Sequence, residues 1–312
     1  MADVLCAGVI VADVLVSDAG PDIFSRDMTR LPLRWAPGGD ACNQAGDLAA
    51  LGVSAALCGK VGADGTGDAI LSTLERQGVS AGRIVRTAQN PTSVSIVLIR
   101  PDGERHLIGT QDGTNSALRR EDFDLSGLSD AKIFSLGSLY GSTALTGRLC
   151  ASLLAEAKAA GCKTVLDLMQ PKRGSLADAA QALAFCDLFL ANEAEACALT
   201  GASGAHEAAR ILADCGAGAV AVKQGARGCL LFENGRFTAI PACRAQAIDT
   251  TGAGDALAAG TIAALLEGKT LAQSLRFGCA CGALAVEQTG AFGAVGSRAQ
   301  VEERLRQCGA GA

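Results

Sequence analysis

The segment DTTGAGDALAAG, Asp249 to Gly260, reads as a turn that opens into a helix near the C-terminal end of the chain. A short extended stretch, AQAI, precedes it, and the alanine-rich residues 256–266 favour a helix. The turn is then formed by Gly252 to Asp255, where the first N–H groups of the helix have no partner within the helix. These free N–H groups, the positive end of the helix dipole and the small glycines suit an anion such as phosphate.

The acid in this turn, Asp255, is unusual for a site that only binds, because a carboxylate repels a phosphate. It makes chemical sense if it takes a proton from a hydroxyl nucleophile. The amides of Gly252, Ala253 and Gly254 would then absorb charge on a transferred phosphoryl group. The segment therefore indicates phosphotransfer. Taken alone, it is explained equally well by an acid that caps a helix after an ordinary tight turn.

Outward from this segment, short apolar runs alternate with helical patterns that end at glycine. Strands are expected at 55–61, 163–168, 188–192 and 220–223, and helices at 64–78, 144–160 and from 193 to Gly216. The apolar N-terminal residues 1–16 are interpreted as the first strand. This alternation predicts an α/β fold in one domain, 1–312, with a mostly parallel central sheet and helices on both faces.

Two segments interrupt the alternation. The runs 93–100 and 104–110, joined by Pro101-Asp102-Gly103, read as a β-hairpin, and residues 11–37 are irregular. They predict a small, discontinuous β lid over about 11–37 and 93–112. A further hairpin is expected to turn at Asn234-Gly235.

Composition narrows the choice of partners. The net charge is −5, with 27 basic and 32 acidic residues and no long basic run, so neither nucleic acid nor an anionic membrane is an expected partner. The N-terminus has no basic start, and Asp3 and Asp13 interrupt its apolar run, which predicts a cytoplasmic protein without a membrane segment.

The thirteen cysteines are mostly scattered singly in apolar segments, which favours buried thiols in a reducing compartment. The chain has only two histidines and no cluster at metal-site spacing, so carboxylates, hydroxyls and backbone amides must carry the chemistry. Neither a dinucleotide fingerprint after the first strand nor a P-loop is present, which argues against a dehydrogenase.

A second glycine-rich segment, PGGDACNQAGDLAALG at 37–52, reads as a flexible approach followed by a helix. Asp40 and Asn43 would project from its first turn and, with Asp13 after the first strand, offer hydrogen bonds to sugar hydroxyls. The alternative, an N-capped helix after a glycine turn, explains Asp40 but not Asn43.

A third segment, ANEAEACALTG at 191–201, places Glu193 and Glu195 after a strand end. Such carboxylates could hold water around Mg²⁺ near nucleotide phosphates. By itself, the pattern is more typical of acids that stabilise the start of a helix.

In this order, GGDACNQA, NEAEA and DTTGAGD resemble the motifs of the ribokinase-like (PfkB) family of carbohydrate kinases, and most of all its uncharacterised bacterial sugar kinases with a GGDA-x-N start. The resemblance implies a ribokinase-like fold with a β lid that is often used for dimerisation. It also implies phosphorylation of a sugar hydroxyl by ATP. By motif position, the resemblance implies that Asp255 is the general base and that the amides of residues 252–254 form the anion hole.

The resemblance assigns further roles by motif position. Sugar binding falls to Asp13, Gly38, Gly39, Asp40 and Asn43; nucleotide binding to Asn192, Lys223, Gly225, Gly228, Gly254 and Cys279. Glu195 would bind Mg²⁺ through water. Asp249 and Thr251 would begin a site for a monovalent cation such as K⁺, completed by residues 290–296.

Three departures from the family pattern bear on the substrate and the nucleotide. Ribokinases proper read GGKGAN, whereas this chain has Asp40 and Cys42, which argues against ribose itself. Cys279 stands where many relatives have Asn near adenine. Lys172 and Arg173 either meet phosphates or an acidic substrate, or lie in a solvated loop.

The sequence therefore predicts an ATP- and Mg²⁺-dependent kinase of a small sugar or sugar acid, a homodimer through its lid. A nucleoside kinase of the same family is the nearest alternative. Only 4% of the chain is aromatic, which favours a sugar, although Trp35 and Phe24 could offer a wall for a base. A sugar sensor without catalysis is the third possibility, although it would be expected to have lost the acid or the glycines of the turn.

Overall fold

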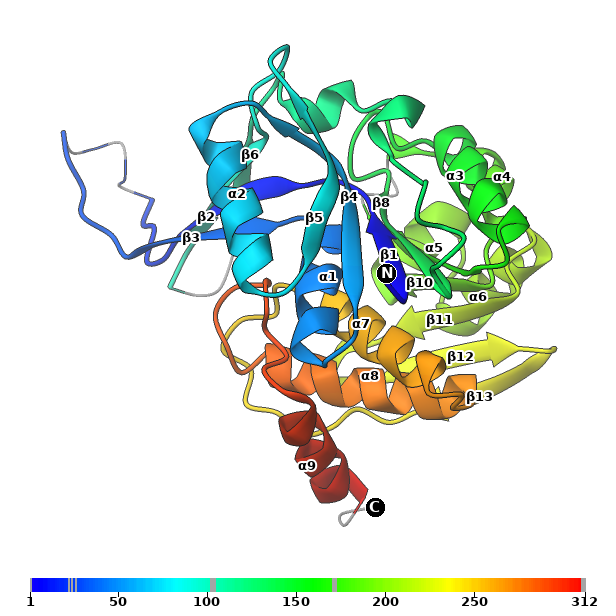
Figure 1. The fold of residues 1–312 in the computed structure, drawn as a ribbon. Helices are drawn as coiled ribbons and strands as arrows, with labels where there is room; N and C mark the ends of the chain where they lie inside the picture. Colours follow the sequence, from blue (N-terminus) through cyan, green and yellow to red (C-terminus); the bar gives the residue numbers. More distant parts are fainter. Residues whose placement is uncertain are drawn as a thin grey trace.

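The larger of two sheets carries the helices, and a smaller four-stranded sheet stands at its side (Figure 1). The computed structural model describes residues 2–21, 23, 25, 27–101, 105–169 and 173–309. In this part of the chain, the larger sheet has nine strands in the order β13-β12-β11-β10-β9-β8-β1-β4-β5. The strands are β1 (Val4–Ala7), β4 (Ala55–Gly62), β5 (Ser80–Thr87), β8 (Ile133–Leu139), β9 (Lys163–Leu168), β10 (Leu188–Asn192), β11 (Ala219–Lys223), β12 (Cys229–Glu233) and β13 (Arg236–Ile240).

Seven of these strands, from β11 to β5, run parallel, and β12 and β13 are antiparallel additions at one edge. The central strands β4 and β8 are buried along their whole length, as continuous apolar strands between two helical layers must be. The expected strands 163–168 and 188–192 are β9 and β10 without any shift of their ends. The predicted α/β architecture is therefore confirmed.

Helices cover both faces of the larger sheet over two separate apolar cores. On one face lie α1 (Asp40–Ala50), α2 (Gly65–Arg76), α7 (Ala253–Leu266), α8 (Leu271–Ala285) and α9 (Arg298–Gly309). On the other lie α3 (Gly147–Ala159), α4 (Leu176–Leu183), α5 (Glu193–Thr200) and α6 (Ala205–Asp214). Figure 1 shows α3 to α6, in green to yellow-green, grouped apart from the orange helices α7 and α8, of which α7 lies beside α1.

The smaller sheet has the strand order β3-β2-β6-β7 in the described residues. It is built from β2 (Val11–Val16), β3 (Leu33–Gly38), β6 (Val94–Ile99) and β7 (Arg105–Gly109). The two predicted lid segments therefore pair with each other, with β2 parallel to β6 and the hairpin β6–β7 antiparallel. The turn residues Asp102 and Gly103 lie outside the described residues, as do Phe24 and Lys172.

The N-terminal run does not form the single strand expected from its apolar pattern. It divides into β1 in the larger sheet and β2 in the smaller one. At Gly8, where the chain leaves the larger sheet, a Cβ atom would come within 2.9 Å of the Cβ of Ala41 and 3.1 Å of the carbonyl oxygen of Gly137. Only glycine permits this close passage, so the strand changes sheets here.

Two further expectations for local structure meet different outcomes. The helix expected to end at Gly216 is two helices, α5 and α6, because Gly201 ends α5 with a left-handed φ of 75°. The hairpin predicted at Asn234-Gly235 is present between β12 and β13, with φ of 52° and 74° at the two turn residues.

The cysteines correct one prediction. Eleven of the thirteen are free thiols, and most of these are buried as expected, but Cys243 and Cys308 form a disulfide. The bond joins the segment after β13 to α9, and its Cα atoms lie 5.5 Å apart. The interpretation of every cysteine as a buried thiol was therefore wrong for this pair, whose partners are separated by 65 positions. No helix of the described chain has the length and apolar character needed to cross a bilayer.

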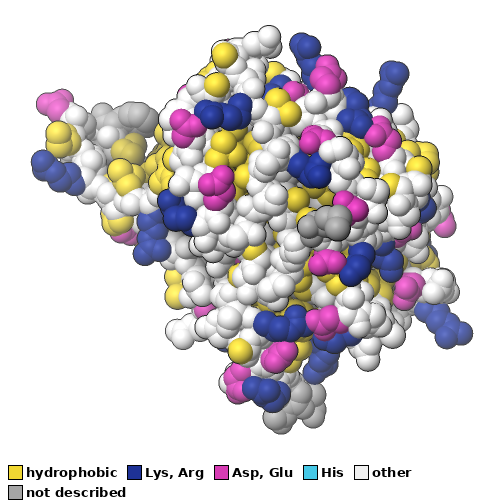
Figure 2. Space-filling view, viewed as in Figure 1, with side chains coloured by type: hydrophobic (Ala, Val, Ile, Leu, Met, Phe, Trp, Pro, Cys, Tyr) yellow, Lys and Arg dark blue, Asp and Glu magenta, His cyan; other side chains and the backbone are white. Residues whose placement is uncertain are grey.

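Acidic and basic side chains are interspersed on the face that Figure 2 shows, without a large patch of one sign. In this view, described residues between β2 and β3 project from the body of the protein at the side of the smaller sheet. Large exposed apolar side chains occur on it at Leu33, Trp35, Leu107 and Ile108.

Candidate active site

A cavity of about 1500 Å³ opens at the carboxyl ends of the parallel strands, beside the smaller sheet. Ligands of open α/β sheets bind at this edge because the loops that follow the strands gather there. Its wall includes the first turns of α1 and α7, the ends of β9, β10 and β11, and side chains of β2, β6 and β7. The three glycine-rich or acidic segments identified from the sequence therefore meet in one place.

Among the described residues, no side chain caps the start of α7. Gly252 stands before the helix with a left-handed φ of 76° and, as a glycine, has no side chain that could accept a hydrogen bond from the first N–H groups. The amide of Ala253 donates to the carbonyl of Thr250 over 3.4 Å, a long hydrogen bond. Asp255 thus does not cap the helix, and this half of the alternative interpretation is wrong.

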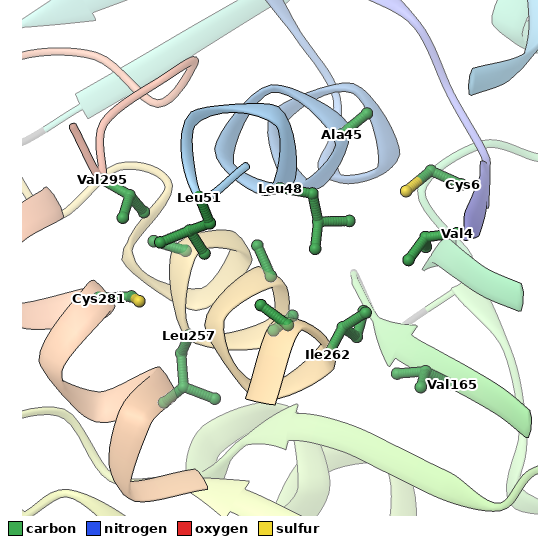
Figure 3. Close-up of a cluster of buried hydrophobic side chains, with 14 of the residues drawn as sticks. Val4, Cys6, Ala45, Leu48, Leu51, Val165, Leu257, Ile262, Cys281 and Val295 are labelled. Atoms are coloured by element: carbon green, nitrogen blue, oxygen red, sulfur yellow. The ribbon is translucent and has the colours of Figure 1, made fainter. Parts of the chain in front are cut away.

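Asp255 instead accepts a hydrogen bond from Asn43, whose Nδ2 lies 2.7 Å from Oδ2 of the acid. Figure 3 shows why these distant residues meet. Leu48 of α1, and Leu51 directly after this helix, point toward α7, where Leu48 lies near Ile262 in one buried cluster. Because the two helices pack closely, their first turns face the same cavity.

The environment of Asp255 disfavours its charged form. Removal from water, and then the charge of Asp167, raise its pKa to about 7, while the hydrogen bond from Asn43 and the charge of Lys223 oppose the rise. Asp40 is also buried, and burial together with Asp255 raises its pKa well above the usual range. An acid with a pKa near neutrality is suited to accept a proton at physiological pH.

A buried ion pair lies beside this acid. Nζ of Lys223, at the end of β11, donates to both carboxylate oxygens of Asp167 in β9, at 2.8 and 3.1 Å. The side chains are 13% and 3% exposed. A Cβ atom added to Gly254 would lie 3.0 Å from this Nζ, so the ammonium group faces the first turn of α7.

The third segment forms a capping box at the start of α5. The side chain of Asn192 accepts from the amide of Glu195, and Oε2 of Glu195 accepts from the amide of Asn192 at 3.0 Å. Burial raises the pKa of Glu195, which lines the cavity. Glu193 takes a different part, because it pairs with Arg227 and accepts from Gln224.

The loop before α7 is fixed by Asp249. One carboxylate oxygen accepts from the amide and the hydroxyl of Thr251, at 2.9 and 2.7 Å. The other accepts from the amide of Gly290 at 3.0 Å. The two segments expected to form a monovalent-cation site therefore lie against each other, with the acid buried between them.

Comparison with known proteins places this geometry in a family. The model of the pfkB family carbohydrate kinases matches residues 1–295. The chain belongs to this family. It is 34% identical over 294 residues to an ATP-dependent ribose-1-phosphate kinase of Halopiger xanaduensis, a match that spans 93% of this chain and 94% of that protein. It is 30% identical over 278 residues to a ribokinase of Haemophilus influenzae, spanning 86% of this chain and 87% of that one.

Solved structures agree with the ribokinase-like fold. The structure of Arabidopsis thaliana ribokinase complexed with ribose and ATP is similar with a TM-score of 0.82 and 25% identity, covering 98% of this chain and 99% of that one. Thermotoga maritima ribokinase has a TM-score of 0.83 over 98% of this chain. The chain is thus a carbohydrate kinase of the PfkB family.

This PfkB chain brings nearly all of the predicted site residues to the cavity. Those in its wall are Asp13, Gly39, Asp40, Asn43, Asn192, Glu195, Lys223, Gly225, Gly228, Thr251, Gly252, Ala253, Gly254, Asp255 and Cys279. Gly38 and Asp249 lie behind the wall. Asp13 was expected to follow the first strand, but it belongs to β2 in the smaller sheet. Its carboxylate lies over Gly38, where an added Cβ atom would be 2.0 Å from Oδ2 of Asp13.

Sequence patterns assign no role to several parts of the wall. Asp167 lies within the expected strand 163–168, and the segment after β13, residues 242–247, carries no motif. Side chains of the smaller sheet, among them Ser95, Leu107 and Thr110, also line the cavity. Arg173 lies in the wall and is exposed, in keeping with a loop that borders the cavity.

Proposed function

We propose that this carbohydrate kinase transfers the γ-phosphoryl group of ATP to a hydroxyl group of a small sugar or sugar acid. Asp255 acts as the general base, and the N–H groups at the start of α7 form the anion hole. The observation that carries the proposal is the acid itself. It has a pKa of about 7, is oriented by Asn43, and stands in a first turn whose N–H groups are not capped by any side chain of the described residues.

In this mechanism, the carboxylate of Asp255 takes the proton of the acceptor hydroxyl as the oxygen attacks the γ-phosphorus, and the bond from this phosphorus to the β–γ bridging oxygen breaks to release ADP. Negative charge on the transferred group develops beside the amides of residues 252–254, which are already oriented and need no rearrangement. Lys223 faces the same turn and adds a positive charge. The smaller sheet, which contributes side chains to the cavity, would exclude water that otherwise hydrolyses ATP.

The sugar would lie between α1 and the smaller sheet. Asp13, Asp40 and Asn43 offer acceptors there, and Gly38 and Gly39 leave room for the chain to pass closely. Oδ1 of Asn43 is buried and has no hydrogen-bond partner among the described residues. A hydroxyl group of the sugar would satisfy this oxygen.

The nucleotide would lie along the ends of β10 and β11. Asn192, Lys223, Gly225, Gly228 and Cys279 border this part of the cavity. ATP as the donor is supported by the similarity to the ATP-dependent Halopiger kinase and to the Arabidopsis ribokinase complexed with ribose and ATP. In place of the Asn found in many relatives, Cys279 would offer adenine only an apolar contact.

Two ions belong to the proposal. Glu195 is a hard oxygen donor at the cavity, as Mg²⁺ prefers, and one of its oxygens is taken by the capping box, so it would act through water. Mg²⁺ would neutralise phosphate charge. Asp249 and Thr251, held against Gly290, would help to form a site for a monovalent cation such as K⁺.

A sugar is favoured over a nucleoside by the composition of the wall. None of the described residues that line the cavity is aromatic, and Trp35 of β3 is not among them. A nucleoside base is commonly held against an aromatic ring. The sensor alternative has less support, because the acid and both glycines of the turn are in place.

A second copy of the chain is the proposed partner of the smaller sheet. Four large apolar side chains, Leu33, Trp35, Leu107 and Ile108, are 41% to 65% exposed on its two edge strands. Edge strands invite pairing with another chain, and a two-fold axis would cover both apolar groups at once. The expected assembly is therefore a homodimer through this sheet.

The test of the function is the Asp255→Asn variant with a panel of sugars, sugar acids and nucleosides, scored by ADP release. Loss of the base should lower kcat by about 10²–10⁴ while ATP binding and folding stay near normal. Asp68→Asn, which removes an exposed acid of α2, is the control and should leave activity unchanged. Near-normal turnover of Asp255→Asn would refute the base, and sugar binding without any ADP release would favour the sensor.

A further inference from the structure

We infer that Asp167 is a positioning residue of the reaction. It holds Lys223 at the start of α7, so that the ammonium group meets the transferred phosphoryl group, and the pair sets the charge that surrounds Asp255. This inference rests on the proposed role of Asp255 as the base.

The fold brings the two residues together across one strand. Asp167 is in β9 and Lys223 is the last residue of β11, and β10 lies between these strands. All three strands run parallel, so their carboxyl ends share one edge, and the long lysine side chain reaches over the end of β10 to the acid. The contact is thus made at the cavity and not within the sheet.

Lys223 is suited to receive a phosphate. Its ammonium group has three N–H bonds, and its two hydrogen bonds within the described residues, at 2.8 and 3.1 Å, both go to Asp167. Its Nζ lies beside Gly254, where a Cβ atom would be 3.0 Å from it, so the glycine leaves space next to the ammonium group. Arg173 and Arg244 are the other basic side chains of the described wall, and both are exposed.

Asp167 allows the buried Lys223 to stay charged and oriented toward the cavity. An ammonium group removed from water loses hydration, and an acid partner restores much of that energy and keeps the group charged. The charge and hydrogen bonds of Asp167 raise the pKa of Lys223 despite its burial. Two contacts to one carboxylate also fix the direction of the side chain, which an unpaired lysine would not hold.

The pair also controls the charge near the base. The groups that face Asp255 are Asp40, Asp47 and the amide of Asn43 from α1, Asp167 from β9 and Lys223 from β11, with Asp13 and Glu195 further along the wall. Asp167 raises the pKa of Asp255 and Lys223 lowers it. The two effects oppose each other, so loss of either partner alone should shift the pKa of Asp255.

The experiment compares the pH dependence of kcat/KM for the sugar at saturating MgATP in Asp167→Asn and Lys223→Met. Because Asp255 acts as a carboxylate, activity is lost as the pH falls through its pKa. Asp167→Asn should move this acidic limb to lower pH by about one unit, and Lys223→Met should move it to higher pH by about one unit. Both should lower kcat, by about tenfold and about 100-fold respectively, with little change in KM for the sugar.

Matched controls come from two exposed ion pairs, through Asp68→Asn and Lys158→Met, which make the same charge changes far from the cavity. Neither should move the limb. The double variant Asp167→Leu/Lys223→Met replaces the pair with apolar side chains, so it should fold, restore the limb to near its wild-type position and keep the low kcat.

Limbs that shift in the same direction, or that do not shift beyond the controls, would overturn the inference. So would a double variant whose limb stays displaced. These outcomes are separate from failure of the proposed function, because an inactive Asp255→Asn enzyme would still identify the base.

Discussion

The amide Nδ2 of Asn43 lies 2.7 Å from Oδ2 of Asp255 and joins two helices across 212 positions of the chain. The sequence motif suggests that Asn43 contacts the sugar. The structure shows that one end of its amide is committed to the acid, while Oδ1 is left buried and without a partner. One side chain can therefore orient the base and accept a hydrogen bond from the sugar.

Replacement of Asn43 by Ala should weaken the enzyme in a pH-dependent way. The hydrogen bond from Asn43 lowers the pKa of Asp255, which is otherwise raised by burial to about 7. Without it the pKa rises, so a smaller fraction of the acid is ionised at neutral pH. We expect kcat/KM at pH 7 to fall by about 10–100-fold and the acidic limb to move to higher pH.

The measurement is a pH profile of kcat/KM from pH 5.5 to about 9. This range should cover the fall in wild-type activity that accompanies protonation of Asp255. Asn90→Ala, at a surface amide that binds the backbone of Asp112, serves as the control. A variant with the wild-type limb would show that the hydrogen bond does not orient the base.

Much of the fold is predictable from the sequence because the signals are local. β9 and β10 are continuous apolar runs with clear ends, and Asn234-Gly235 is a dipeptide typical of β-hairpin turns. The N-terminal run misled because its apolar pattern continues through Gly8, where only contacts with Ala41 and Gly137 show that the strand changes sheets.

The residues of the candidate site also differ in whether the local sequence reveals them. The residues of the three motifs are recognisable because each motif is a short segment with a chemical purpose. Asp167 and the segment 242–247 carry no local signal, since their place in the wall depends on which strands are neighbours. The Cys243–Cys308 disulfide was missed for the same reason, because nothing in the sequence pairs two cysteines so far apart.

Gly252 should tolerate alanine poorly, and Gly268 provides a matched comparison at the other end of α7. Both have a left-handed φ, 76° and 77°. A Cβ atom at residue 252 would lie 2.6 Å from the Cα of Ala291, whereas nothing lies within 4 Å at residue 268. The backbone cost of about 1–2 kcal/mol is common to both, so the difference reports the collision.

Urea unfolding should therefore show Gly252→Ala destabilised by about 1–3 kcal/mol more than Gly268→Ala. The same variant should lose activity, because the shift moves the first turn of α7 away from the phosphate. Equal losses of stability in the two variants would show that the contact with Ala291 relaxes freely.

The disulfide should couple the C-terminal helix to the nucleotide side of the cavity. Cys243 belongs to the wall, and Cys308 is in α9. The same segments are also joined by Arg304, which donates to the carbonyl of Arg244 and pairs with Glu287. Reduction by a dithiol, or Cys308→Ser, should lower stability by about 2–4 kcal/mol and raise KM for ATP several-fold.

Thermal unfolding with and without the dithiol checks this expectation, together with KM for ATP and for the sugar measured separately. Cys215→Ser, at a free cysteine that is only partly buried, is the control. If the oxidised and reduced enzymes melt at the same temperature, the bond does not stabilise the fold.

The proposed dimer can be tested at the smaller sheet. Trp35 is 41% exposed on β3 and Leu107 is 63% exposed on β7. A glutamate at either position would place a charge in an interface that should be mainly apolar. Trp35→Glu and Leu107→Glu should therefore each raise the Kd of the dimer by at least about tenfold. Sedimentation equilibrium over a range of concentrations gives the result directly. Phe185→Glu replaces another exposed apolar side chain, which follows α4 and belongs to neither edge strand of this sheet, and should leave assembly unchanged. Because Leu107 also lines the cavity, its variant should raise KM for the sugar as the dimer dissociates, whereas Trp35→Glu should do so only if pairing of the sheets holds β7 in place. A wild-type protein that is monomeric at all concentrations would refute the dimer and leave the apolar side chains of β3 and β7 to cover the substrate within one chain.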